Sequence, residues 1–197
     1  MAVLLGRGLG GSGGGGAPSG PAGGDLAGTY PDPTLSSQGS ADGFVLTSDG
    51  AAGTAFERPP GFEFDYVEIT APVSVTAASA ATATTCITGS AVVYDGATRV
   101  CIEAFSPYLE TIATSLATIT VLLYDGATQV GILAFHGRGD GTRTSIDPMF
   151  ARRFLTPSAA SHTYSIRAYR GVGNGTFNAG TGGDDTFLPA YIRITKA

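Results

Sequence analysis

A pattern of apolar residues around Asp-Gly occurs twice in the middle of this chain. AVVYDGATRVCIEAF spans residues 91–105, and VLLYDGATQVGILAF spans residues 121–135. Asp-Gly between two apolar runs is a strong local indication of a β-hairpin, because this dipeptide accepts the positive φ of a two-residue turn. The sequence therefore predicts two similar hairpins, with turns at Asp95-Gly96 and Asp125-Gly126.

The two turns also predict which residues pair and which enter the core. A two-residue turn at each Asp-Gly would pair Tyr94 with Ala97 and Tyr124 with Ala127. Side chains alternate between the two faces along a strand, so one face of each hairpin should be buried. The expected core residues are Val100, Ile102 and Ala104 in the first copy and Val130, Ile132 and Ala134 in the second.

The remainder of the chain after residue 60 also has the pattern of an all-β domain. Strands are expected at residues 64–70, 162–169 and 189–196, and the second of these places Tyr164, Ile166 and Ala168 on one face. A short helix is expected only around residues 148–153. Many short strands separated by glycine-rich turns are typical of a β-sandwich, and we expect a two-sheet jelly roll.

Composition divides the chain into an arm, residues 1–60, and a folded domain, residues 61–197. The chain has 197 residues, 30 of them glycine, and residues 10–24 are too rich in glycine to bury much surface. Ahead of this stretch stand four apolar residues, which we interpret as a docking peptide that orders on a partner, or alternatively as a disordered terminus. They are Val3, Leu4, Leu5 and Leu9.

Charge and hydropathy exclude several classes of partner. The net charge is −5 and the basic residues are scattered, so nucleic acid is not an expected partner. No apolar run reaches the length of about 18 residues that a membrane span needs, and the first residues are too short a run for a secretory signal. We therefore expect the chain to be made in the cytoplasm and to remain outside membranes. Cys86 and Cys101 are expected to be buried free thiols, with a bridge between them as the alternative.

Residues 24–50 carry a recognisable motif. GDLAGTYPDPTL is followed by GFVLTSDG, and two prolines favour an extended backbone in the first part. The stretch resembles the linker ahead of the head domain in fibres and other surface appendages of tailed bacteriophages, where forms close to GDLSGTYPNPTV and GQVLTSDG are usual. The linker residues matched are Asp25, Leu26, Gly28, Thr29, Tyr30, Pro31 and Pro33.

The resemblance implies a fold and a role. The C-terminal part, including PAYIRIT near the end, is similar to jelly-roll heads of phage appendages, which are themselves similar to the trimeric tumour-necrosis-factor and complement type. It implies a homotrimer on the virion surface, attached through its N-terminal arm to a major capsid or tail protein. Aromatic residues that could line a subunit contact are Tyr66, Phe105, Tyr108, Phe135, Tyr169 and Tyr191.

We expect a capsid decoration protein or short head fibre, because the link between arm and head is short. A tail-fibre head that binds a host glycan or protein is the first alternative. A secreted bacterial adhesin is the second, although it would need a signal peptide.

Catalytic and metal-binding patterns are weak, and we expect neither an enzyme nor a cofactor. The sequence has two histidines, His136 and His162, but no serine in a Gly-x-Ser-x-Gly elbow on a strand-to-helix turn, as this type of hydrolase nucleophile would need. Asp147, Asp184 and Asp185 lack the spacing of a calcium loop. Arg138-Gly139-Asp140 is interpreted as an ordinary charged loop, with a contact loop for a receptor or neighbouring subunit as the alternative.

Overall fold

The computed structural model describes residues 58–112, 117–137 and 145–197, together with six short strands between residues 20 and 57. The chain divides into two units, Met1–Glu57 and Arg58–Ala197. In the first unit β1 pairs with β3, β2 with β4, and β5 with β6, all antiparallel. Their bounds are β1 Gly20–Pro21, β2 Leu26–Ala27, β3 Thr29–Tyr30, β4 Thr34–Leu35, β5 Val45–Ser48 and β6 Thr54–Glu57.

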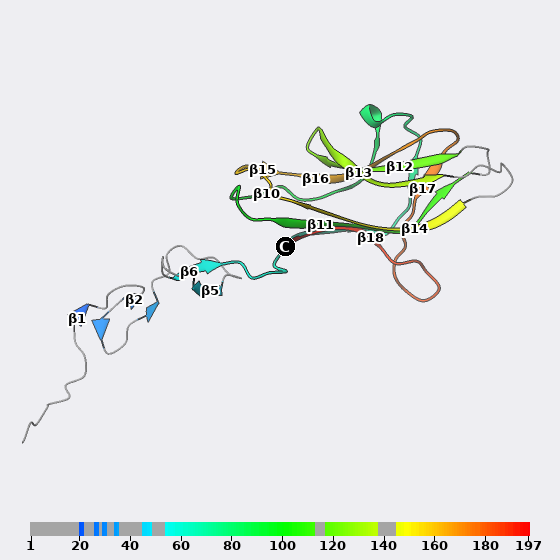
Figure 1. Ribbon diagram of the computed structural model, residues 1–197. Coiled ribbons are helices and arrows are strands. Elements are labelled where there is room, and N and C mark those ends of the chain that lie inside the picture. Colours follow the sequence, from blue (N-terminus) through cyan, green and yellow to red (C-terminus); the bar gives the residue numbers. More distant parts are fainter. Residues whose placement is uncertain are drawn as a thin grey trace, which may run out of the picture. The chain divides into compact units, whose positions relative to one another are not determined.

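The second unit is a sandwich of two antiparallel sheets (Figure 1). The first sheet has the order β7-β18-β11-β17-β8, and β14 pairs with the other side of β11. Its strands are β7 Glu63–Ile69, β8 Val73–Val75, β11 Val100–Thr111, β14 Ser145–Leu155, β17 Gly175–Phe177 and β18 Ala190–Lys196.

The second sheet has the order β13-β12-β16-β9. Its strands are β9 Thr84–Thr88, β12 Thr118–Asp125, β13 Thr128–Gly137 and β16 Tyr164–Arg170. A two-stranded ribbon of β10 Val92–Val93 and β15 Ser161–His162 lies at one end, and the 3-10 helix η2 spans Ala80–Thr82. Within this unit the chain passes repeatedly from one sheet to the other, and the first and last strands of the unit, β7 and β18, are neighbours. This is the connectivity of a jelly roll, so the predicted fold class is confirmed.

Alternating apolar residues explain why these strands face the core as they do. Tyr164, Ile166 and Ala168 on β16 are at most 1% exposed, as predicted for the strand at this position. Val100, Ile102 and Ala104 on β11 are fully buried, which confirms the core face predicted for the first copy of the repeat. Burial of these residues from both inner faces stabilises the sandwich, because apolar area is removed from water.

The first copy of the repeat does not form a hairpin, which corrects the prediction. Val92 and Val93 pair with His162 and Ser161, and the Tyr94 N–H donates to the Ala160 carbonyl at 3.0 Å. Gly96 does adopt a positive φ of 80°. The turn is instead organised by the carboxylate of the preceding aspartate, which accepts from the backbone N–H groups of the two residues after the glycine. The first Asp-Gly therefore forms a turn, but the segments on either side of it do not pair with each other.

The second copy does form a hairpin, but its turn lies one residue later than predicted. Asp125 pairs with Thr128, so Gly126 and Ala127 form the turn, and Gly126 has a φ of 55°. Two register shifts in the β12–β13 pairing interrupt the alternation along β13. Ile132 is consequently 63% exposed, and its prediction as a core residue was wrong.

Two further expectations can be compared with the fold. Residues 148–153 belong to strand β14 rather than to a helix, because Pro148 is tolerated on an edge strand where its missing N–H breaks no ladder. Cys86 and Cys101 are buried free thiols, as predicted. Within the described part of the chain, no helix is long and apolar enough to cross a membrane.

Candidate functional site

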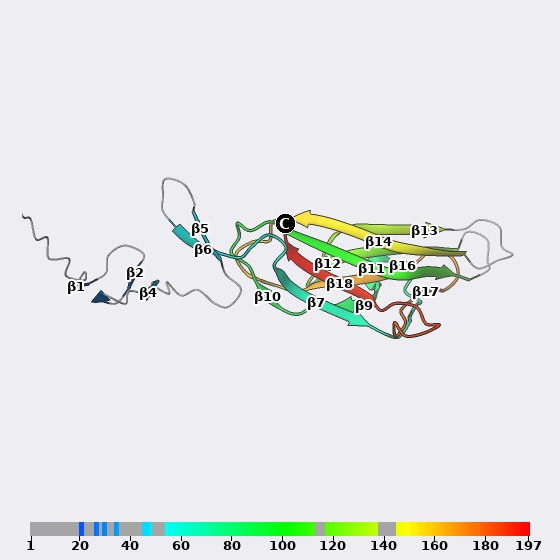
Figure 2. The same cartoon turned by 90° about the horizontal axis from the view of Figure 1, so that it is seen from below.

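The outer side of the first sheet carries a group of aromatic side chains that we call the aromatic face. Tyr191 on β18 lies opposite Phe105 on β11, and Phe105 lies opposite Phe150 on β14. Tyr66 on β7 and Phe154 on β14 complete the group. Tyr66, Phe150 and Phe154 are 44%, 56% and 46% exposed. Figure 2 shows β14, β11, β18 and β7 side by side in the sheet that carries these residues.

Rings of the aromatic face contact one another across neighbouring strands. The Phe105 and Tyr191 ring centroids are 5.4 Å apart with 28° between the planes, and Tyr66 and Tyr191 are 5.6 Å apart with 35°. Offset or tilted ring pairs at such distances are the arrangement that aromatic side chains favour over a face-to-face sandwich. The pairs therefore make the aromatic face one continuous group across three strands.

Ion pairs cross the same face between neighbouring strands. Arg193 Nε donates to Glu63 Oε2 at 2.7 Å, and Arg152 Nε donates to Glu103 Oε1 at 2.7 Å. The Arg152 guanidinium also lies 5.0 Å from the centre of the Phe150 ring. The charges of these arginines are thus largely matched locally, which lowers the cost of covering the face with a partner.

Three further exposed apolar residues lie on the edge strands β13 and β14, and we call them the apolar edge. They are Ile132, Phe135 and Ile146, which are 63%, 69% and 55% exposed. His136 of β13 contacts Asp147 of β14 through Nδ1 and Oδ2 at 2.8 Å, which joins the two edge strands. The apolar edge therefore continues from β14, which also carries part of the aromatic face.

The aromatics predicted from sequence as contact residues fall into four places. Tyr66, Phe105 and Tyr191 belong to the aromatic face, and Phe135 belongs to the apolar edge. Tyr108 instead packs edge-on against Phe187 at 4.6 Å. Tyr169 lies on β16, opposite Thr120 of β12. Phe150, Phe154, Ile132 and Ile146 were missed, because an exposed apolar residue and a buried one look alike in a single sequence.

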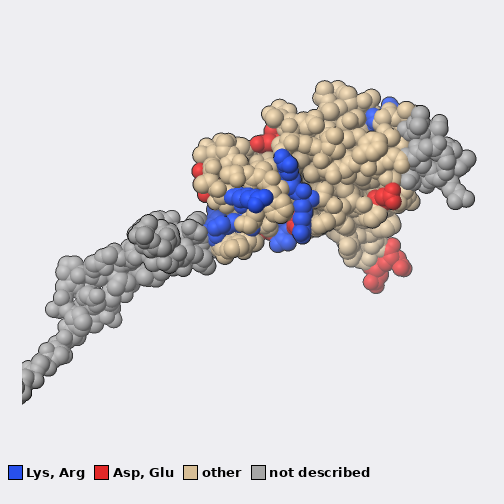
Figure 3. Space-filling model, in the orientation of Figure 1, with Lys and Arg blue, Asp and Glu red and all other residues tan. Residues whose placement is uncertain are grey.

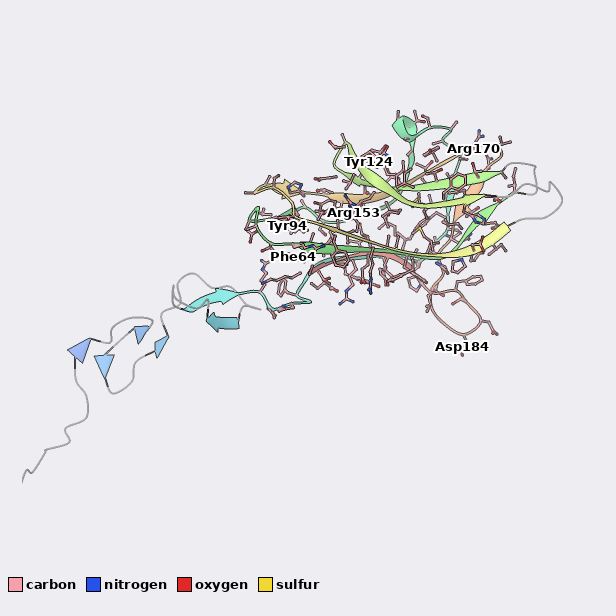
Figure 4. All side chains as sticks on the ribbon, in the orientation of Figure 1. Phe64, Tyr94, Tyr124, Arg153, Arg170 and Asp184 are labelled. Atoms are coloured by element: carbon pink, nitrogen blue, oxygen red, sulfur yellow. The ribbon has the colours of Figure 1, made fainter. Side chains whose placement is uncertain are left out.

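A polar cluster forms at the end of the sandwich where the β10–β15 ribbon lies. His162 Nδ1 is 2.5 Å from Asp125 Oδ2, and His162 Nε2 is 3.1 Å from Ser158 Oγ. The imidazole stacks on Tyr164 with an interplanar angle of 8° and meets the Tyr94 ring edge-on. Figure 4 shows Tyr94 beside Phe64 at this end of the domain. Sequence reasoning missed the cluster, because strand pairing brings Asp125 to residues far along the chain.

Ionisation of the phenols near this cluster is suppressed. Burial raises the pKa of Tyr164 to about 12, and the negative charge of Asp125 adds to the effect. Burial also raises the pKa of Tyr94 well above its usual range. Both rings are therefore neutral, apolar walls for the imidazole at physiological pH.

The acidic residues weighed as metal ligands lie apart. Asp184 and Asp185 occupy a loop between β17 and β18 that extends away from the sheet, with Asp184 at its tip (Figure 4). In Figure 3 the acidic tip of this loop is separated from the basic side chains, which gather on another part of the domain. The carboxylate of Asp147 instead contacts the imidazole of His136. Among the residues that the structure describes, no three His, Cys, Asp or Glu side chains gather as a metal site would require.

Several predicted site residues lie outside the described part of the chain. They include the apolar residues of the arm and the Arg138-Gly139-Asp140 loop. Of the linker motif, Leu26, Thr29 and Tyr30 fall in the short strands β2 and β3, and the remaining motif residues are not described.

Comparisons with known proteins find only weak structural similarity. No protein-family model and no curated protein matches the chain. Among solved structures, one similar chain comes from the structure of infectious bursal disease virus Gt strain. It is 8% identical with a TM-score of 0.37, and the match covers 83% of this chain and 46% of that chain.

A carbohydrate-binding module from Cellvibrio mixtus lichenase 5A, solved in complex with cellotriose, is a second similar structure. It is 15% identical with a TM-score of 0.20, and the match covers 79% of this chain and 88% of the module. This chain thus spans less than half of the viral chain it matches. At these TM-scores neither likeness bears on function.

Proposed function

We propose that this protein is a homotrimeric surface appendage of a tailed-phage virion, a capsid decoration protein or short head fibre. The jelly roll is the displayed head, and the N-terminal arm attaches it to a capsid or tail protein. The observation that carries the proposal is the aromatic face together with the apolar edge. A structural role of this kind requires surfaces that associate, and it requires no chemistry of its own.

The two apolar surfaces support self-association through unlike patches. Large exposed groups of apolar side chains are uncommon on monomers and mark contact sites. Aromatic residues and arginine are also the residue types enriched at the centre of protein interfaces. The aromatic face spreads over β7, β18, β11 and β14, whereas the apolar edge lies on β13 and β14, so the face of one copy can receive the edge of the next. Contacts of this head-to-tail kind close into rings, of which the trimer is one.

The short link between linker motif and head supports the placement on the capsid. β6 ends at Glu57, and β7 begins at Glu63, so few residues separate the last strand of the arm from the jelly roll. A tail fibre that reaches a host receptor would usually carry a shaft between anchor and head. The tail-fibre head is therefore the second candidate.

The attachment role of the arm can be tested by truncation. A variant without residues 1–23 should keep its β-sheet circular dichroism and its oligomeric mass, because the described core residues all lie beyond residue 57. It should fail to join particles assembled without the protein, whereas the full chain should join them. Immunogold labelling of those particles separates head from tail.

Normal incorporation of the truncated variant would contradict attachment through the arm. A loss of its β-sheet signal would show that the arm contributes to folding instead.

A further inference from the structure

We propose that Ser158 is an activated nucleophile, with His162 as its general base and Asp125 as the residue that positions the base. This inference goes beyond the structural role and reverses the expectation that neither histidine takes part in catalysis. The three side chains form a continuous chain of contacts, Ser158 Oγ to His162 Nε2 at 3.1 Å and His162 Nδ1 to Asp125 Oδ2 at 2.5 Å. A serine, histidine and aspartate in this relation are recognised by geometry, whatever their order in the chain.

The hydrogen bonds fix which nitrogen of His162 carries the proton. The Asp125 carboxylate can only accept, so in the neutral imidazole Nδ1–H donates to it and Nε2 bears the lone pair. Nε2 also lies 3.1 Å from the Ser158 carbonyl oxygen. That carbonyl also accepts the Ala160 N–H at 2.8 Å. In the tautomer with the proton on Nδ1, Nε2 can accept the proton of the Ser158 hydroxyl.

The base is held by ordered elements while the nucleophile is open to solvent. The His162 side chain is 14% exposed, and it is packed between the rings of Tyr94 and Tyr164. The Gly126 N–H donates to the Thr163 carbonyl at 2.9 Å, which ties the β12–β13 turn to the residue after the base. Ser158 is exposed, so a substrate can reach it. A site built in this way keeps its geometry without a substrate present.

The amide that follows the nucleophile lies beside the turn at Gly96. Gly96 lies against Ala159, and a Cβ added to Gly96 would be 3.0 Å from the Ala159 nitrogen. The absence of a side chain at Gly96 therefore lets the turn pack closely against the residue that follows the nucleophile. The amide in this position contributes to oxyanion stabilisation in other serine hydrolases.

The chemistry that this arrangement supports is acyl transfer from a short ester. Ser158 Oγ attacks the ester carbonyl carbon and gives its proton to His162 Nε2. The carbonyl oxygen becomes negative beside Ala159, and collapse of the tetrahedral intermediate expels the alcohol, which takes the proton from Nε2. Water then attacks the acyl-serine with the same base, which releases the acid and restores the hydroxyl. Exposed Ala159 and Ala160 beside the serine suit a small acyl group such as acetyl.

The test uses the full chain with two probes. Diisopropyl fluorophosphate should form one adduct, mapped to Ser158 by peptide mass spectrometry, and 4-nitrophenyl acetate should release nitrophenolate. Ser158→Ala should abolish the adduct, and His162→Gln should slow both reactions at least about 100-fold. Ser161→Ala is the matched control, because Ser161 is an exposed serine in the same segment, and it should react as the unmodified protein does.

Asp125→Asn addresses the positioning role, with folding checked by circular dichroism. In the unmodified protein the labelling rate should rise with pH, because Nε2 must lose its proton before it can act as a base. The titratable groups that face the imidazole are Asp125, Tyr94 and Tyr164. Removal of the one carboxylate should lower the labelling rate and displace this pH profile, whereas a purely structural residue would leave the profile in place.

Three results would overturn the proposal. They are the absence of an adduct on Ser158, equal labelling of Ser158 and Ser161, and nitrophenolate release that is unchanged in Ser158→Ala. If His162→Gln does not fold, the role of the base is tested on the unmodified protein. A labelling rate that is independent of pH between about 5 and 8 would then also overturn the proposal. None of these results depends on whether the protein is a trimer, so they do not test the proposal of a trimeric surface appendage.

Discussion

At the scale of single residues, burial controls the chemistry of the thiols and phenols. Cys86 on β9 lies in the core, and burial raises the pKa of its thiol to about 12 from its ordinary value of 9.0. Burial also raises the pKa of the Cys101 thiol. Both thiols therefore remain protonated where an exposed cysteine would begin to ionise, which makes them poor nucleophiles.

The raised pKa of Cys86 predicts a loss of stability in alkali. Above pH 9 the thiol ionises in the unfolded chain but stays protonated in the fold, so the unfolded state binds fewer protons and the free energy of unfolding falls as pH rises. The contribution of this thiol is about 1 kcal/mol by about pH 10. Urea unfolding at about pH 8 and about pH 10 measures it, and Cys86→Ala should show a smaller fall between the two. An equal fall in both proteins would contradict the assignment.

At the scale of elements, sequence pattern predicted strands better than it predicted their partners. Alternation in residues 162–169 identified both β16 and the face that it buries. The Asp-Gly signal identified two places of positive φ, Gly96 and Gly126, but only the second joins two paired strands. Pairing of β10 with β15 depends on residues far along the chain, which no local pattern contains. The register shifts in the β12–β13 pairing could not be predicted from the sequence either, and they place Ile132 on the outer side.

Gly126 in the β12–β13 turn gives a test at this scale. Gly126→Val should lower the free energy of unfolding by about 1–3 kcal/mol, because a β-branched residue resists positive φ. Nothing lies within 4 Å of a Cβ at this position, so backbone conformation rather than a clash would cause the loss. Gly131→Ala on β13 is the control, since a Cβ there also meets nothing within 4 Å and no positive φ is required. Equal melting temperatures for Gly126→Val and the unmodified protein would exclude strain at this turn.

The candidate site illustrates the same limit. Three of the aromatics selected from sequence share the aromatic face. Phe105 lies opposite Tyr191 on β18, and Tyr66 lies opposite the residue two positions further along β18, so all three side chains point to the same side of the sheet. Phe150 and Phe154 were missed, since an exposed apolar residue and a buried one look alike in a single sequence. The cluster of Ser158, His162 and Asp125 was missed for a different reason: two strands and a turn bring it together, and no spacing in the sequence marks it.

At the scale of the whole molecule, the two apolar surfaces predict how association can be broken. Phe150→Glu on the aromatic face and Phe135→Glu on the apolar edge should each weaken association at least tenfold, about 1.4 kcal/mol, because an unpaired carboxylate would be buried. Both side chains are more than half exposed in the single chain, so folding should be unchanged.

Val93→Glu is the matched control, because Val93 is 74% exposed on the β10–β15 ribbon, outside both surfaces. Sedimentation velocity should give the mass of the unmodified protein for this control and a reduced mass for the other two. If Phe150→Glu and Phe135→Glu kept the full mass, the two surfaces would not be the subunit contact.

The proposal of a trimeric appendage depends most directly on the mass of the full chain in solution. The chain has a mass of 19.8 kDa, and light scattering coupled to size exclusion measures the assembly without assumptions about its shape. We expect a mass about three times that of the chain, held over a range of concentrations. A mass equal to one chain across the same range would contradict the trimer and leave the aromatic face without the partner proposed for it.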